Sequence, residues 1–240
     1  MQPGGRISRA CLLACLLTAG SAGVAADAVP PSRTDAALLR ELGELRDAFV
    51  RRIDEEGYRL CPRPHIELGT GPAGGDYLSE RNLIRITLWS QLSAQQRDGF
   101  AGVAGAAGAP QAARAVYESG TYRWVFVQQL GHWWQDCRDM ARPESYAAQS
   151  GANRMALAFW RERDPRFAAA IVAGAVHLVS AVPDPLPAGE AAQTWLERHP
   201  GEASQSPAYE WLQAKMIATL AQEVPQPSFH KSLSQPLYPY

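Results

Sequence analysis

Two pairs of polar side chains stand four residues apart in segments that are otherwise rich in apolar and small residues. The first pair is Gln128 and His132, and the second is Gln149 and Asn153. Side chains at this spacing lie on one face of a helix, with Cβ atoms roughly 5–6 Å apart, so each pair could meet one ligand. Imidazole binds zinc well, whereas a neutral amide oxygen is a poor zinc ligand. Amides both donate and accept hydrogen bonds, which suits neutral peptide groups.

The segment Trp124–Asp136, with the sequence WVFVQQLGHWWQD, resembles the zinc-binding helix of the zincin metallopeptidases. In the H-E-x-x-H motif of that helix, the two histidines bind zinc and the glutamate is the general base. Here Gln128 stands at the first histidine position, Gln129 stands at the glutamate position, and His132 keeps the second histidine. The frame of the motif is kept, while its reactive groups are changed.

The resemblance continues on the next expected helix. Gluzincins, the thermolysin-like branch of the zincins, take their third zinc ligand from E-x-x-x-D, and Gln149 and Asn153 fall on those two acidic positions. Three of the four changes replace a carboxylate with an amide of nearly the same shape, which indicates a retained pocket without its charge. Losing a general base typically costs about 10²–10⁴ in rate. The resemblance therefore implies a zincin-like fold that has lost its zinc, keeps at most weak metal binding at His132, has no other cofactor and is catalytically inactive.

This resemblance predicts a peptidase-like binding protein rather than an enzyme. In zincins the edge strand of the sheet lines the cleft and pairs with an extended peptide, which is an example of β-augmentation. The expected partner is therefore an extended peptide or an envelope protein. Five residues are expected to form the cleft floor: Gln128, Gln129, His132, Gln149 and Asn153.

Two other functions remain open from the sequence. A working hydrolase would need an altered metal site, in which His132 joins Asp136 on the same helix, or His65 and His177 converge on the cleft. His177 is also a candidate for steadying an oxyanion, as a later histidine does in several gluzincins. A purely structural helical module would instead bury the motif residues in a solid core.

The chain opens with the features of a secretory signal peptide. A basic region at residues 1–9 precedes an apolar run at residues 10–19, and small residues follow up to an A-x-A cleavage motif that ends at Ala28. A cut after Ala26 is an alternative, and a lipoprotein signal at Cys15 would leave a very short apolar region. We therefore expect an exported protein, periplasmic or secreted, that lacks residues 1–28.

Cys11 and Cys15 leave with the signal peptide, so Cys61 and Cys137 remain as an even pair in an oxidising compartment, where disulfides persist. A bridge between them would tie a strand region to the end of the motif helix and stabilise the fold by roughly 2–4 kcal/mol. The alternative is two buried free thiols.

Composition favours one globular domain and gives no sign of a nucleic-acid partner. Residues 29–240 are enough for a single sizeable core. The net charge of −1 lacks the basic excess that binding to nucleic acid or an anionic membrane would require. No stretch after the signal peptide is apolar enough for a transmembrane helix.

Hydrophobic periodicity predicts a mostly helical α+β fold in one gluzincin-like domain. Residues 29–59 should hold a helix capped by Asp35, residues 60–165 the sheet and the motif helices, and residues 166–240 further helices and a tail. The Ala/Gly-rich residues 99–113 fit either a loose helix or a loop. The expected elements are strands at 61–68 and 82–88 around a Gly-rich turn at 69–75, helices at about 35–56, 119–137, 145–163, 165–181, 188–198 and 207–223, and an extended tail at 225–240.

Overall fold

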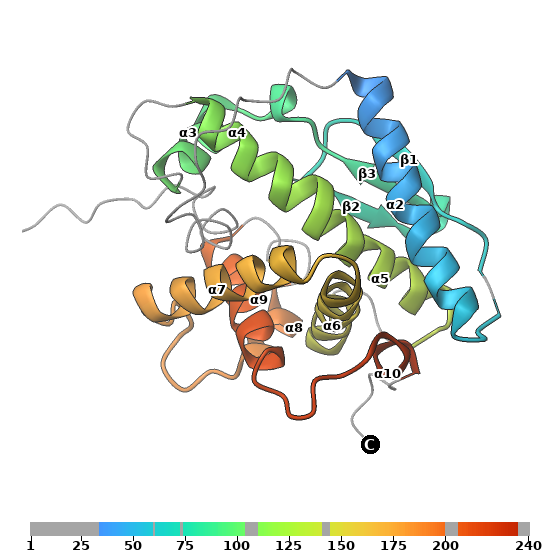
Figure 1. Cartoon of the computed structure of the whole chain (residues 1–240). Helices are drawn as coiled ribbons and strands as arrows, with labels where there is room; N and C mark the ends of the chain where they lie inside the picture. The colour runs from blue at the N-terminus through green and yellow to red at the C-terminus, as the bar shows by residue number, and fades with distance from the viewer. Residues whose placement is uncertain are drawn as a thin grey trace, which may run out of the picture.

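The computed structural model describes residues 34–59, 61–72, 74–103, 110–140, 145–199 and 206–234. The predicted signal peptide lies outside them. The described part is mostly helical with a small sheet (Figure 1), and none of its helices has the length and hydropathy needed to span a bilayer. Its elements are α2 (Asp35–Glu55), β1 (His65–Leu68), β2 (Asp76–Leu78), η1 (Ser79–Arg81), β3 (Leu83–Ile86), η2 (Trp89–Gln91), α3 (Ala94–Val103), α4 (Pro110–Ser119), η3 (Gly120–Val125), α5 (Phe126–Cys137), α6 (Tyr146–Arg163), α7 (Pro165–Ala181), α8 (Ala192–Arg198), α9 (Pro207–Leu220) and α10 (Phe229–Ser234).

The three short strands form a mixed sheet in the order β1–β3–β2. β1 runs parallel to β3, and β2 runs antiparallel to it with Tyr77 opposite Ile84. The sequence pattern misses β2, because three residues are too few to show a clear alternation. Glycine is required just before this strand. Gly75 has a φ of +132°, and a Cβ atom there would lie 2.4 Å from the carbonyl oxygen of Arg85.

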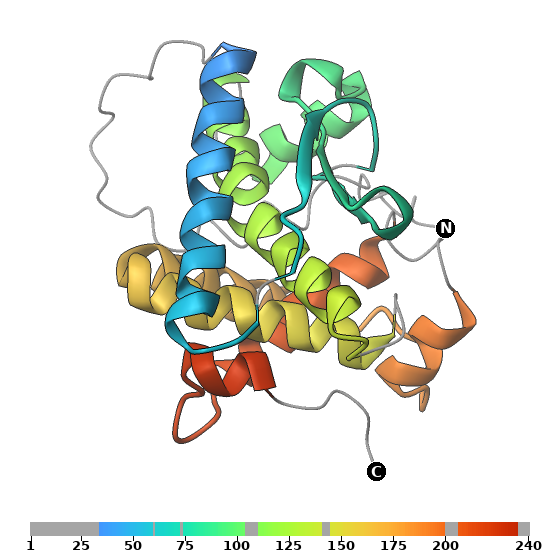
Figure 2. The same ribbon diagram turned by 90° about the vertical axis from the view of Figure 1, so that its right-hand side faces the viewer.

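α2 and α5 both pack against the sheet, α2 on β1 and α5 on β2 and β3 (Figures 1 and 2). α6 packs across α5, and α7, α9 and α10 pack against α6. Apolar side chains from these elements form one continuous core, which includes Ile84, Phe126 and Met155. A smaller cluster around Trp195 and Trp211 joins α8 to α9.

The predicted motif helix is the second half of a longer helical run. α4 leads into the π-helical turn Gly120–Val125 and then directly into α5. The run therefore begins at Pro110 rather than near residue 119, and proline is well suited to a first helical turn. π-helical turns are frequent at functional sites, and this one directly precedes the motif.

Short polar residues cap the N-termini of several other helices. Ser145 caps α6 and Asp164 caps α7, next to the starts that the sequence predicts. The cap predicted for α2 is wrong. Thr34 is the cap, because its hydroxyl oxygen accepts a hydrogen bond of 3.2 Å from the Ala37 N–H, and Asp35 lies in the first turn.

The C-terminal segment is not extended throughout, contrary to the sequence prediction. Part of it forms α10, whose Phe229 and Leu233 side chains are buried in the core. The indole N–H of Trp134 on α5 donates a hydrogen bond of 3.2 Å to the carbonyl oxygen of Leu233. A six-residue helix with so few buried positions gives no readable period in the sequence.

Candidate functional site

The two helices that carry the sequence motifs cross at very close range. A Cβ atom at Gly131 of α5 would lie 3.0 Å from the Cα atom of Ala152 on α6, and 3.2 Å from its Cβ atom and its carbonyl oxygen. The absence of a side chain at Gly131 therefore permits the crossing. As a result, the polar faces of both helices meet at one place.

Four buried amide side chains form a hydrogen-bonded group, which we call the amide cluster: Gln128, Gln149, Asn153 and Gln213. Gln213 comes from α9 and lies at the centre. Its Oε1 accepts from Gln128 Nε2 at 3.1 Å and from Asn153 Nδ2 at 2.6 Å, and its Nε2 donates to Gln149 Oε1 at 2.9 Å. Tyr209, one turn earlier on α9, donates to the same Gln149 oxygen at 2.9 Å. Neutral hydrogen bonds thus join α5, α6 and α9.

The amide cluster is closed rather than open like the expected cleft floor. The exposed fraction is 7% for Gln128 and Gln149, 6% for Gln213 and 0% for Asn153. Buried polar atoms normally have hydrogen-bond partners. Asn153 Oδ1 is an exception, because it has no partner among the described residues. The cluster contains no ionised group, so it offers neither a proton acceptor nor an anionic ligand.

His132 continues this network along α5. Its Nδ1 lies 3.2 Å from Gln135 Oε1, and Gln135 Nε2 donates to the carbonyl oxygen of Ala148 at 3.0 Å. Although part of the residue remains exposed, burial of the ring lowers the pKa of His132 to about 4, against the smaller raising effect of hydrogen bonds to Gln135 and Gln149. The imidazole is therefore neutral near pH 7.

Gln129, for which the sequence resemblance predicts the general-base position, stands apart from the amide cluster. It is half-buried and takes no part in the hydrogen bonds that join the described residues of the cluster. One step along an α-helix turns the side chain by about 100°, so adjacent residues face different neighbours. The structure therefore brings Gln128, His132, Gln149 and Asn153 together and leaves Gln129 aside.

The alternative metal sites have little support in the described residues. His65 on β1 and His177 on α7 are exposed. Asp136, the other residue of the pair with His132, is exposed and accepts a hydrogen bond of 2.9 Å from the hydroxyl of Tyr77. Within the described ranges, no three or more His, Cys, Asp and Glu side chains gather in a way that could hold a metal ion.

Sequence reasoning missed Tyr209 and Gln213, through which α9 closes the site. These residues stand four apart and share one face of α9, and Met216 on the same helix places its sulfur 3.8 Å from Asn153 Nδ2. A pair of polar residues on a largely buried helix is a signal in the sequence that could have pointed to these site residues. No motif spacing connects it with the two motif helices, however.

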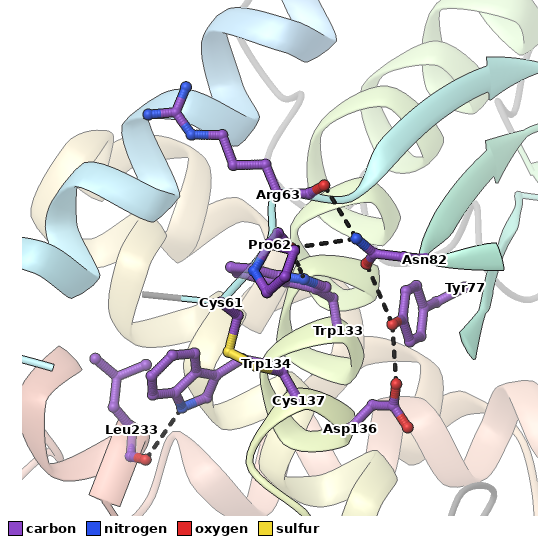
Figure 3. Close-up of a disulfide and its surroundings, with 10 residues drawn as sticks. All are labelled: Cys61, Pro62, Arg63, Tyr77, Asn82, Trp133, Trp134, Asp136, Cys137 and Leu233. Carbon is purple, nitrogen blue, oxygen red and sulfur yellow. Dashed lines mark hydrogen bonds between the residues drawn. A yellow bond between two sulfur atoms is a disulfide. The ribbon is translucent and has the colours of Figure 1, made fainter. Parts of the chain in front are cut away.

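The sheet side of α5 carries a different set of contacts, around a disulfide between Cys61 and Cys137 (Figure 3). Tyr77 of β2 donates its hydroxyl proton to Asp136 at 2.9 Å, and this hydroxyl also lies 3.5 Å from Asn82 Oδ1. Burial, followed by the hydrogen bond and the negative charge of Asp136, raises the pKa of Tyr77 well above its ordinary value. The tyrosine hydroxyl therefore remains protonated and able to donate.

Comparisons of the chain with protein-family models, with curated proteins and with solved structures find no match. The functional argument therefore depends on the chemistry of the site.

Proposed function

We propose that this chain is an exported, metallopeptidase-like protein that lacks catalytic activity and binds an extended peptide or an envelope protein. The amide cluster is the observation that carries the proposal. Gln128 and Gln149 stand at the positions that the gluzincin resemblance assigns to zinc ligands, and Gln129 stands at that of the base. All three are neutral amides, and two of them, Gln129 and Gln149, replace a carboxylate with a group of nearly the same shape that carries no charge.

The chemistry of these side chains supports loss of the metal. A catalytic zinc needs three protein ligands, drawn mainly from imidazole nitrogen and carboxylate oxygen, and an open position for water. His132 supplies one imidazole, and the groups within its hydrogen-bond reach are the amides of Gln135 and Gln149. Good structural zinc sites gain on the order of 10–16 kcal/mol from the ion, and a single imidazole retains little of this.

Gln213 supports the same proposal from the third helix. Its amide bonds to Gln128, Gln149 and Asn153 at once, so neutral hydrogen bonds hold the helices together at the positions that the proposed resemblance assigns to an ion. A buried polar network of this kind rigidifies the fold when its members are satisfied. The site then serves as a scaffold.

Burial of the motif residues is also what a structural helical module would show, so the binding proposal depends on the neighbouring sheet edge, to which we assign the peptide. β2 forms one edge of the sheet, contacts α5 and is half-buried. In zincins the edge strand lines the cleft and pairs with an extended peptide. In such β-augmentation, main-chain hydrogen bonds give affinity and side-chain pockets give specificity.

Hydrogen exchange tests this proposal on the mature chain, residues 29–240, mixed with extended peptides prepared from casein. We expect the peptides to slow amide exchange in β2, residues 76–78, and to remain uncut. β1, residues 65–68, forms the opposite edge of the same sheet and is the internal control, so its exchange should not change.

The other outcomes identify the competing functions. Casein cleavage that requires zinc and stops on chelation would establish a hydrolase with a non-standard site. Peptides that neither protect β2 nor are cleaved would favour the structural helical module, and the binding proposal would be abandoned.

A further inference from the structure

The disulfide Cys61–Cys137 is one link in a closed ring of bonds and contacts (Figure 3). The carbonyl oxygen of Pro62 accepts a hydrogen bond of 3.2 Å from Asn82 Nδ2. Asn82 Oδ1 lies 3.5 Å from the hydroxyl of Tyr77, which in turn donates to Asp136 at 2.9 Å. Asp136 directly precedes the second cysteine. The ring therefore passes from the entry of β1 through the β2–β3 turn and β2 to the end of α5.

Asn82 occupies the key position in this ring. Its φ of 45° lies in the left-handed region, which asparagine tolerates better than most residues. Its Nδ2 also donates to the carbonyl oxygen of Arg63 at 3.1 Å, so the side chain holds two successive carbonyl groups. The indole N–H of Trp133 donates to the same Pro62 oxygen at 3.0 Å. The position of residues 61–63 thus sets the position of Asn82.

We propose that this ring is a redox-sensitive clamp, in which the disulfide fixes residues 61–63 and thereby holds Tyr77 and β2 against α5. The disulfide and the peptide bonds 61–62 and 136–137 are the covalent links of the ring. Its other links are the hydrogen bonds from Asn82 to Pro62 and from Tyr77 to Asp136 and the 3.5 Å contact between Tyr77 and Asn82, which open and close locally in the native state. Because β2 is the strand to which we assign peptide binding, the regulatory role of the clamp rests on the proposed function. Its mechanical role, in which the disulfide holds β2 against α5, does not depend on the proposed function.

The reductant is a dithiol. Its thiolate attacks the sulfur of Cys137, which belongs to an exposed residue, and forms a mixed disulfide while Cys61 leaves as a thiolate and takes up a proton. The second thiol of the reductant then attacks the mixed disulfide and releases Cys137. The chain ends with two thiols and the reductant with one disulfide, so bonds and electrons balance.

Hydrogen exchange of the full mature chain tests the clamp in three forms: oxidised, reduced with dithiothreitol, and with both Cys61→Ser and Cys137→Ser. Opening the clamp should speed exchange in β2, residues 76–78, by about tenfold, which corresponds to the loss of one or two net hydrogen bonds. The buried stretch of α6, residues 155–160, reports global unfolding, which loss of the disulfide also favours, so its acceleration should differ from the local opening of β2.

A second variant separates the hydrogen bonds from the disulfide. Tyr77→Phe retains the disulfide and removes the hydroxyl, so β2 should exchange faster already in the oxidised protein and respond less to reduction. Tyr58→Phe is the matched control, because the described contacts of Tyr58 are between its ring and those of Trp134 and His230. This control should behave like the parent chain.

Unchanged β2 exchange in protein whose thiols titrate as fully reduced would overturn the clamp. Equal acceleration in β2 and α6 would also overturn it, because β2 would then respond only through the stability of the whole fold. If β2 responds to reduction but no peptide protects it, the clamp stands and the proposed function fails. If peptides protect β2 equally in both redox states, the proposed function stands and the clamp does not regulate it.

Discussion

α5 is polar on two sides, and the two sides are stabilised by different means. Toward α6 and α9 it meets the amide cluster, which is buried, neutral and held by hydrogen bonds between side chains. Toward the sheet it meets Tyr77 through the carboxylate of Asp136 and is joined to residue 61 by the disulfide. We call the side toward α6 and α9 the inner side and the side toward the sheet the outer side. The comparison indicates that the inner side fixes the packing of the helices, while the outer side is where the position of a strand can change.

Removing Gln213, the centre of the amide cluster, should give the largest loss of stability on the inner side. Gln213→Ala leaves Gln128, Gln149 and Asn153 without their shared partner, at a cost on the order of 3 kcal/mol in the free energy of unfolding. Urea denaturation measures this loss. The matched control is Gln193→Ala, which removes an exposed glutamine bonded to Glu197 and should cost less than about 0.5 kcal/mol. Similar small losses in both variants would mean that the cluster does not hold the helices together.

The inner side should also respond to acid through His132. Its folded-state pKa is lowered from 6.5 to about 4, so between these values the unfolded chain binds a proton that the folded chain does not. Stability should therefore fall as the pH drops through this window, by about 2–3 kcal/mol after allowance for partial exposure. Unfolding curves for the parent and His132→Gln across the window measure the difference. An identical acid response in both proteins would assign the loss to other groups.

The helix crossing offers a matched pair of glycine substitutions. Gly131→Ala pushes a methyl group against the backbone of Ala152 and should destabilise the fold by about 1–3 kcal/mol. Gly43→Ala on α2 meets nothing within 4 Å and should stabilise the fold by up to about 1 kcal/mol. Thermal unfolding of both variants checks the opposite signs. A tolerated alanine at 131 would show that the crossing is looser than described.

The outer side should give a smaller loss with a different pH dependence. Tyr77→Phe removes the hydrogen bond to Asp136, which costs about 1–2 kcal/mol near neutral pH. Because the folded state raises the pKa of Tyr77 above 10.0, the parent chain should lose stability as the pH rises past that value, and the variant should lose less. Unfolding measured at neutral and alkaline pH checks both statements. A variant that keeps the full alkaline loss would place its origin elsewhere.

Local rules in the sequence predict most helices, but not the contacts that close the site. Ser145 and Asp164 mark helix starts, because short polar residues satisfy free backbone N–H groups. The four-residue spacing within α5 and α6 puts the polar residues of each helix on one face. Gln213 could not be placed in this way, since it comes from a distant helix and its role depends on packing. β2 and α10 are too short to show a period, and their positions depend on tertiary contacts such as those of Tyr77 and Phe229.

Zinc affinity is the most direct test of the central claim that the amide cluster replaces a metal site. Calorimetric titration compares the parent mature chain with a variant that carries Gln128→His, Gln149→Glu and Gln213→Ala, which restores two ligands and removes the central amide. We predict no binding by the parent at about micromolar zinc, and stoichiometric binding by the variant, because His, His and Glu form a complete zincin ligand set. Tight stoichiometric zinc in the parent, lost on His132→Ala, would contradict the account and make a working metal site the better description.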